Sequence, residues 1–172
     1  EEVARLRGAV QQVSEQLREL GEKVLQRAGV EESRIFDAQI MMAQDEDFLS
    51  AVEVLIRNNH LSAETAYEFK ALELRALWSS SQSAQLRDRL TDLHAIQIRM
   101  LRALLGRESE ETWAVPDDEQ VIVVAHELSP GLTVQLDREH VVGLVSEQGT
   151  RTSHAAILAH SLGIPAVMGA PG

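Results

Sequence analysis

The chain has 172 residues, of which 44% are hydrophobic and 25% charged, a composition typical of a globular protein with one large or two small domains. Its formal net charge of −11 argues against nucleic acids and anionic membranes as partners, and favours a basic partner or plain solubility. The absence of cysteine excludes disulfides, zinc-thiolate sites and thiol nucleophiles. No apolar run reaches the length of a membrane span and no signal peptide is evident, so we expect a cytoplasmic protein without membrane insertion.

Residues 1–106 are expected to form an all-α region. An apolar seam in steps of three and four residues predicts a first helix that ends at Gly29 and packs against another helix. Further helices are expected over 32–43, 45–57, from a Ser62 cap to about residue 78, and over 84–105, with a polar linker at 79–83. The seam consists of Val3, Leu6, Val10, Val13, Leu17, Leu20 and Val24.

Residues 107–172 are expected to form an incomplete α/β domain. Short apolar runs at 121–125 and 141–145 predict buried strands, and residues 166–168 a third strand. The intervening segments predict a short helix over 129–136 and another after residue 153, so strands and helices alternate as in a parallel sheet. Because three strands make a small sheet and the chain opens inside a helical pattern without methionine, we expect a fragment of a longer domain.

The most informative segment is Gly-Thr-Arg-Thr-Ser-His at residues 149–154, followed by an apolar run that stops at Gly163. Thr152 or Ser153 is expected to cap the next helix with a side-chain oxygen, which places His154 in the first turn. Free backbone N–H groups and the helix dipole stabilise an anion such as a phosphate there, and a neutral imidazole is nucleophilic near pH 7. A lone histidine after such a cap is more often a partly buried polar residue, so the interpretation depends on the longer string.

Residues 149–169 resemble the phosphohistidine signature of the phosphoenolpyruvate-utilising enzymes, which include enzyme I of the bacterial sugar phosphotransferase system, pyruvate phosphate dikinase and phosphoenolpyruvate synthase. The resemblance implies that His154 carries a phosphoryl group on a swivelling α/β domain. Thr150 departs from the second glycine usual in enzyme I, and His160 stands where enzyme I often has arginine. The residues that the resemblance implies for positioning the phosphoryl group are Gly149, Arg151, Thr152 and Ser153.

The helical region resembles enzyme I in particular, through residues 35–48 and 89–106. In that family these helices form a subdomain that binds the small phosphocarrier HPr, which the resemblance implies for residues 1–106. Gln39 departs from a histidine that is frequent there. The partner-binding candidates are Asp37, Met41, Met42, Asp45, Asp47, Phe48 and Arg89.

The chemistry of these candidates fits a docking surface, but it also fits a helical core. The methionines are adaptable contact residues, Phe48 is a possible anchor, and the acids would steer a basic partner. Alternatively, the methionines belong to the core and the acids to a solvated turn. Arg89 is either a basic interface residue or a member of a weak surface ion pair.

Residues 129–136 resemble the enzyme I segment whose threonine accepts a hydrogen bond from the active histidine. The resemblance implies this role for Thr133, and such a bond would leave the Nε2 atom of His154 free to attack phosphorus. The alternative is that Thr133 only bonds its own helix backbone.

Together the two resemblances imply a phosphoenolpyruvate-protein phosphotransferase, an enzyme that passes a phosphoryl group from phosphoenolpyruvate through His154 to HPr. They also imply that phosphoenolpyruvate and magnesium bind in a C-terminal barrel absent from this chain, and that the chain itself holds no metal or other cofactor. Two alternatives are the phosphohistidine domain of a dikinase or synthase, and a non-enzymatic helical adaptor joined to a regulatory α/β domain.

Overall fold

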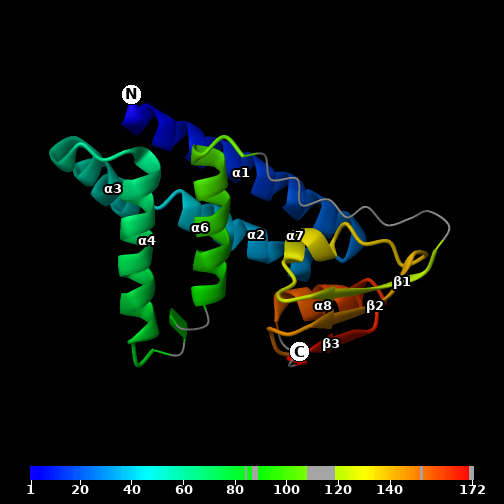
Figure 1. Cartoon of the computed structure of the whole chain (residues 1–172). Helices are drawn as coiled ribbons and strands as arrows, with labels where there is room; N and C mark the ends of the chain where they lie inside the picture. The colour runs from blue at the N-terminus through cyan, green and yellow to red at the C-terminus, as the bar shows by residue number, and fades with distance from the viewer. Residues whose placement is uncertain (84, 87–88, 108–118, 152, 171–172) are drawn as a thin grey trace. The chain divides into compact units, whose positions relative to one another are not determined.

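The computed structural model describes residues 1–83, 85–86, 89–107, 119–151 and 153–170. It is mostly helical and contains one small parallel sheet (Figure 1), which confirms the predicted combination of an all-α region with a parallel α/β domain. The helices are α1 (Glu2–Arg27), α2 (Val30–Ala43), α3 (Glu46–Asn59), α4 (Ala63–Ser79), α6 (Leu90–Leu104), α7 (Pro130–Thr133) and α8 (His154–Ser161). The strands are β1 (Val121–Ala125), β2 (Val141–Ser146) and β3 (Ala166–Met168).

The chain divides into two compact units, one of residues 1–18 and 36–109 and the other of residues 19–35 and 110–172. We call them the helical unit and the sheet unit. The sequence analysis drew one boundary at residue 106, whereas the end of α1 and the first turns of α2 group with the sheet. The difference arises because an unbroken apolar seam predicts a helix but does not say which neighbours each part of that helix contacts.

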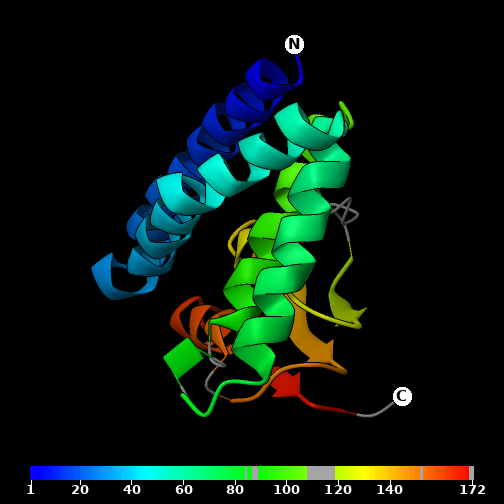
Figure 2. The ribbon, with the colours of Figure 1, turned by 90° about the vertical axis from the view of Figure 1, so that its left-hand side faces the viewer.

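The helical unit is built from amphipathic helices that bury their apolar faces. In α1 the seam is buried from Leu6 onward, while Val3 is half-buried. Helices α4 and α6 lie side by side (Figure 2), and α3 packs against α4. Helix α3 begins at a cap in which Asp45 accepts a hydrogen bond from the backbone N–H of Phe48 at 2.8 Å.

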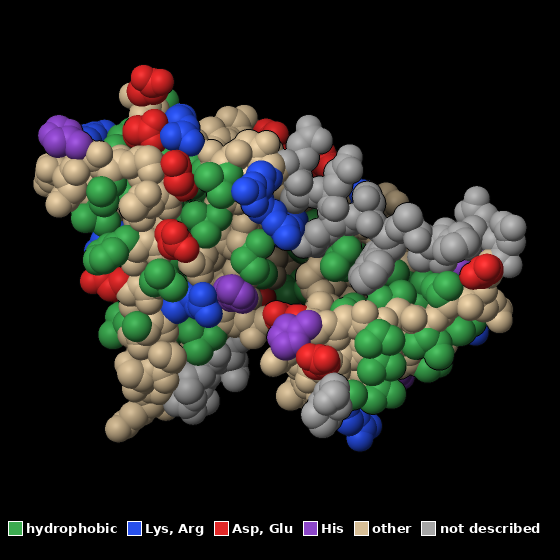
Figure 3. All heavy atoms as spheres, viewed as in Figure 1, with side chains coloured by type: hydrophobic (Ala, Val, Ile, Leu, Met, Phe, Trp, Pro, Cys, Tyr) green, Lys and Arg blue, Asp and Glu red, His purple; other side chains and the backbone are tan. Residues whose placement is uncertain are grey.

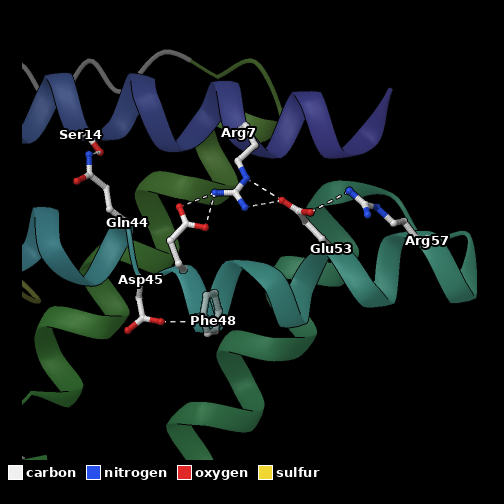
Figure 4. Close-up of polar contacts among 8 residues, drawn as sticks. Arg7, Ser14, Gln44, Asp45, Phe48, Glu53 and Arg57 are labelled. Atoms are coloured by element: carbon white, nitrogen blue, oxygen red, sulfur yellow. Dashed lines mark hydrogen bonds and ion pairs between the residues drawn. The ribbon is translucent and has the colours of Figure 1, made fainter.

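Charged side chains fasten α1 to α3 within the helical unit (Figure 4). The guanidinium of Arg7 donates to both carboxylate oxygens of Glu46, at 2.8 and 2.9 Å, and its Nε donates to Glu53 at 2.7 Å. Arg57 donates to the other oxygen of Glu53 at 3.0 Å. The two carboxylates raise the pKa of Arg7, as expected when hydrogen bonds favour the charged form.

The sheet unit contains three parallel strands in the order β1–β2–β3, with Val123 opposite Leu144 and Val145 opposite Val167. Helix α7 contacts α8, and α8 contacts β3. One hydrophobic core joins these elements. Its buried members are Val123, Leu128, Leu136, Val141, Leu144, Ala155, Ala159 and Ile164.

The expectation that β1 is buried on both faces was wrong. Val123 points into the core at 6% exposure, whereas its neighbours Ile122 and Val124 are 61% and 70% exposed. Val142 and Val167 are exposed as well, and Figure 3 shows hydrophobic side chains gathered over the strands. The physical reason is that, within the described chain, the core formed with α8 takes only the alternate residues that point to one face.

Helix α7 ends at Thr133, earlier than the predicted residue 136. The backbone continues in turns, in which the N–H of Gln135 bonds to Leu132 and that of Leu136 bonds to Thr133. Arg27, in the last turn of α1, donates to the carbonyl of Val134 and, at 2.7 Å, to that of Leu136. A single arginine therefore joins the end of α1 to the segment that follows α7.

We predict that Arg27→Met destabilises the chain. Methionine keeps most of the apolar stem but cannot donate to the carbonyls of Val134 and Leu136. Losing these charge-assisted bonds should lower the free energy of unfolding by about 1–3 kcal/mol, measured by urea denaturation. Arg18→Met, at an exposed position on the same helix, is the matched control, and equal unfolding midpoints for the two variants would contradict the prediction.

Candidate functional site

His154 is the first residue of α8 and its side chain is exposed. The loop before it leaves the carboxyl end of β2, where sites in parallel sheets are usually found. The backbone N–H of Ile157 bonds to Ser153 at 3.0 Å, which closes the first turn and leaves the preceding N–H groups without helical partners. The structure thus places His154 as the sequence predicts.

Ser153 occupies the predicted N-cap position, with extended dihedral angles of −66° and 151°, but its side chain makes no capping bond. Its Oγ is buried and has no hydrogen-bond partner among the described residues. The side chain turns towards Gly149, where an added Cβ would lie 3.4 Å from Oγ. The predicted side-chain cap is therefore wrong for Ser153, and Thr152 lies outside the described residues.

Two glycines shape the loop that presents His154. Gly149 has a φ of +99° and Gly169 a φ of +72°, a region that side chains disfavour. A Cβ at Gly169 would lie only 3.3 Å from the carbonyl of Gly149, so the loop and the residue after β3 approach closely. Thr150 lies outside the left-handed region and its carbonyl accepts from Ser153 N–H at 3.0 Å, so threonine fits this turn as well as glycine would.

The start of the loop is fixed to the end of β1. The Nδ1 atom of His126 lies 2.6 Å from a carboxylate oxygen of Glu147, and the N–H of Gln148 donates to the His126 carbonyl at 2.8 Å. Arg151, further along the loop, is exposed. These bonds hold the backbone on one side of Arg151 while leaving its charged side chain in solvent.

His154 faces a groove of about 450 Å³ inside the sheet unit. One wall comes from the first turns of α2 and the remainder from α7 and α8. The lining residues are Glu31, Glu32, Arg34, Ile35, Pro130, His154, Ile157 and Leu158, which we call the His154 groove.

The charged wall of the His154 groove is organised by short contacts. Ser161 donates its hydroxyl to Glu32 at 2.6 Å, which joins α8 to α2 and lowers the pKa of Glu32 by stabilising its ionised carboxylate. Arg34 donates to Glu31 at 2.9 Å within α2. The groove therefore combines one guanidinium and two carboxylates with an apolar floor.

Glu31, Glu32 and Arg34 were not predicted from the sequence as neighbours of the histidine. Glu32 and its partner Ser161 are 129 positions apart, and no local pattern reports a contact of that separation. The available signal was compositional: two acids and an arginine open α2 directly after the Gly29 turn.

Thr133 is fully buried, and its hydroxyl donates to the carbonyl of Ser129 at 2.9 Å. This is the backbone bond that the alternative interpretation expects of a helix residue. Thr133 is absent from the described lining of the His154 groove. A hydroxyl that donates can still accept, so the predicted bond from His154 stays a prediction.

The partner-binding candidates differ in exposure. Met41 is 75% exposed, so it is not a core residue, and Asp37 and Asp47 are exposed as well. Met42 is half-buried, as is Phe48, whose ring meets the buried Tyr67 edge-on at 5.4 Å between centroids. Both interpretations thus hold in part: Met41 is a surface residue and Phe48 is partly packed.

Three other positions in the helical unit have defined surroundings. Asp45 caps α3, which gives this carboxylate a structural role besides any role in docking. Gln39 is buried and donates to Asp92 at 3.0 Å, so it is unsuited to a partner contact. Arg89 is exposed immediately before α6.

In the part of the chain that the structure describes, no group of three or more histidine, aspartate or glutamate side chains is arranged to hold a metal ion. Over the same residues, none of the helices combines the length and apolarity that crossing a membrane requires.

Comparisons with known proteins match this architecture. Residues 1–89 match the family described as PEP-utilising enzyme, N-terminal, and residues 117–172 match the family described as PEP-utilising enzyme, mobile domain, where PEP is phosphoenolpyruvate. Because the first match covers more than half of the chain, the chain belongs to the PEP-utilising enzymes. His154 lies within the segment that matches the mobile domain.

Particular relatives carry a more specific name. The chain is 32% identical over 168 residues to phosphoenolpyruvate-protein phosphotransferase of Geobacillus stearothermophilus, and 35% identical over 169 residues to the enzyme of Enterococcus faecalis. Each match covers 98% of this chain but only 29% of the relative.

Two solved structures are similar over 98% of this chain and 67% of their own chains. The solution structure of an Enzyme I protein superposes with a TM-score of 0.77 at 33% identity. The N-terminal domain of a protein described as Enzyme 1 - Nitrogen superposes with a TM-score of 0.66 at 28% identity.

We predict that the bond between Ser161 and Glu32 makes stability depend on pH. The pKa of Glu32 in the folded chain lies below its ordinary value of 4.5, so the bond stabilises the fold above that pH and is lost as the pH falls through the lowered pKa. Ser161→Ala should therefore lower the melting temperature at pH 7, and the difference from wild type should shrink as the pH drops below 4.5.

Ser33→Ala is the control for this experiment, because the Ser33 hydroxyl donates to the Val30 carbonyl and not to a carboxylate. Its effect on the melting temperature should be independent of pH. A Ser161→Ala difference that persists unchanged at low pH would show that Glu32 ionisation is not involved.

Proposed function

We propose that this chain is the phosphohistidine-bearing and carrier-docking part of a phosphoenolpyruvate-protein phosphotransferase acting in the cytoplasm. The observation that carries the proposal is the position of His154: exposed, first in α8, at the carboxyl edge of a parallel sheet, inside the segment that matches a mobile domain of PEP-utilising enzymes. The function proposed for His154 is to accept a phosphoryl group and to pass it to the carrier HPr.

The chemistry needs only groups present in the sheet unit. A ring nitrogen of His154 gives its lone pair to phosphorus while the bond from phosphorus to the donor atom breaks and its electron pair returns to the donor. Catalysis of such a transfer consists mainly of in-line positioning and charge stabilisation. The backbone N–H groups at the start of α8 supply positive potential where the phosphoryl oxygens gather charge.

The Gly149 loop supports this role by positioning the start of α8. Gly149 in the loop and Gly169 after β3 permit the close approach of these two segments, and Ala170 N–H donates to the Ser146 carbonyl at 3.0 Å. Arg151 is exposed in the same loop and is proposed to contact the phosphoryl oxygens during transfer, as are backbone groups at Gly149 and Ser153.

The proposed HPr surface lies on the helical unit. Met41 offers an exposed, adaptable apolar contact, and Asp37 and Asp47 provide negative charge that would steer a basic carrier. Phe48 contributes the part of its ring that Tyr67 leaves uncovered, and Arg89 adds a cation at the start of α6.

Phosphoenolpyruvate and magnesium are proposed to act outside the matched region. The chain spans 29% of the curated relatives that it matches, so those enzymes contain extensive sequence without a counterpart here. In this proposal the chain exchanges phosphoryl groups with HPr but does not react with phosphoenolpyruvate by itself.

We predict that His154→Ala abolishes phosphoryl acceptance. The chain is incubated with HPr phosphorylated with radioactive phosphate, repurified, and counted. Because His154 is exposed, its removal should change the free energy of unfolding by no more than about 0.5 kcal/mol. His160→Ala, at an exposed position on the same helix, is the control and should be labelled normally.

Labelling that survives in His154→Ala would place the acceptor at another histidine, with His126, His140 and His160 to be tested in turn. Incubation of the wild-type chain with phosphoenolpyruvate and magnesium alone should give no label, and label under those conditions would contradict the division of roles.

We predict that Met41→Ala weakens HPr binding without destabilising the fold. The side chain is 75% exposed, so the free energy of unfolding should stay nearly constant, while binding measured by calorimetric titration should lose about 1–2 kcal/mol. Val54→Ala, at another exposed apolar position, is the control and should bind normally. Undiminished affinity of Met41→Ala would remove Met41 from the docking surface.

A further inference from the structure

The His154 groove contains one arginine, Arg34, to which the transfer chemistry described above gives no role. Of the described residues that line the groove, Arg34 alone is a permanent cation, and it shares the wall with Glu31 and Glu32. All of these residues belong to the sheet unit, so their arrangement around His154 is local.

The two acids of the wall are already engaged in different ways. Glu32 accepts the Ser161 hydroxyl at 2.6 Å, a contact that joins α2 to α8. Glu31 accepts from Arg34 at 2.9 Å, but their side chains are 76% and 64% exposed. An exposed pair of this kind contributes little to stability, so Arg34 can exchange its partner at small cost.

We propose that Arg34 leaves Glu31 and binds the phosphoryl oxygens when His154 is phosphorylated, an inference that rests on the proposed function. The guanidinium presents a planar fork of N–H donors that matches phosphoryl oxygens. Ile157 and Leu158 form an apolar part of the same groove.

The bonds, electron pairs and protons of the transfer step balance without Arg34. A ring nitrogen of His154 forms the new bond to phosphorus, the bond between phosphorus and the HPr imidazole breaks, and that imidazole recovers the electron pair. Each ring keeps the proton on its other nitrogen. Arg34 forms no covalent bond and moves no proton, so it is a positioning residue that stabilises the phosphorylated product.

Removing Arg34 and removing its present partner should have opposite effects. In Arg34→Gln the phosphoryl group faces two carboxylates without a compensating cation, so phosphorylation becomes less favourable. In Glu31→Gln the guanidinium is released from its competitor and one repelling charge disappears, so phosphorylation becomes more favourable. A role in folding alone does not predict this reversal of sign.

The experiment uses the 172-residue chain, mixed with phosphorylated HPr at a fixed ratio and brought to equilibrium. The phosphorylated fraction of each protein is read by intact-mass spectrometry. The exchange equilibrium should shift against the chain by about threefold to tenfold in Arg34→Gln and towards it in Glu31→Gln. Arg34→Lys should recover part of the loss, and Arg138→Gln, an exposed arginine of the sheet unit away from the groove, should match wild type.

A second measurement follows the phosphoryl group directly. Phosphorus NMR of the phosphorylated chain, recorded over a pH series, should show that the phosphoryl oxygens keep a proton to higher pH in Arg34→Gln than in wild type. High salt should reduce the difference, because screening weakens an exposed charge pair.

The outcomes separate this role from the proposed function. Wild-type chain that takes no phosphoryl group from HPr overturns the proposed function and with it the role of Arg34. Normal labelling of wild type, with the same exchange equilibrium and phosphorus titration in Arg34→Gln, overturns the role of Arg34 alone. A lower melting temperature in Arg34→Gln that accounts for the entire loss of labelling would reduce Arg34 to a structural residue.

Discussion

The bonds that hold the turn between α1 and α2 against α7 and α8 are the constraint on which the His154 groove depends. Arg27 donates to two carbonyls after α7, and Ser161 donates to Glu32. These bonds fix the end of one long helix and the start of the next against α7 and α8. Without them the groove would lose the wall that α2 supplies, while α7 would still contact α8. Leu20 and Val24 of α1 are buried as well, so the polar bonds are the part of this attachment whose strength depends on charge and pH.

The same attachment explains why α1 and α2 belong to both units. Both are uninterrupted helices, so the backbone that lines the groove at Arg34 continues into the helical unit, where α2 carries Asp37 and Met41. The proposed enzyme thus supplies its acceptor histidine from one part of the chain and its carrier surface from another, with α2 contributing to each. The proposed carrier surface carries the acids Asp37 and Asp47, whereas the groove beside His154 combines Arg34 with Glu31 and Glu32.

The sheet unit presents His154 by means of a small core and two glycines. Its core takes Val123 from β1 and Val141 and Leu144 from β2, and α8 contributes small alanines that allow close packing. The glycines at 149 and 169 let two chain segments approach within a distance that side chains would prevent. The other face of the sheet carries exposed valines and an isoleucine and takes no part in the site.

The amino-acid sequence by itself determined the kinds of element and the position of His154. The seam of α1, the Ser62 cap of α4, the alternation of strands and helices that implies a parallel sheet, and the position of His154 all follow from local patterns, because periodicity and capping are properties of neighbouring residues. Only the tertiary structure decided the remainder. It assigned residues 19–35 to the sheet unit, exposed one face of β1, turned Ser153 away from its cap, buried Gln39 and placed Arg34 in the same groove as His154. Apart from Ser153, whose side chain turns towards nearby Gly149, each of these depends on contacts between residues far apart in the chain, and the strength of such a contact is set by geometry that no local pattern contains.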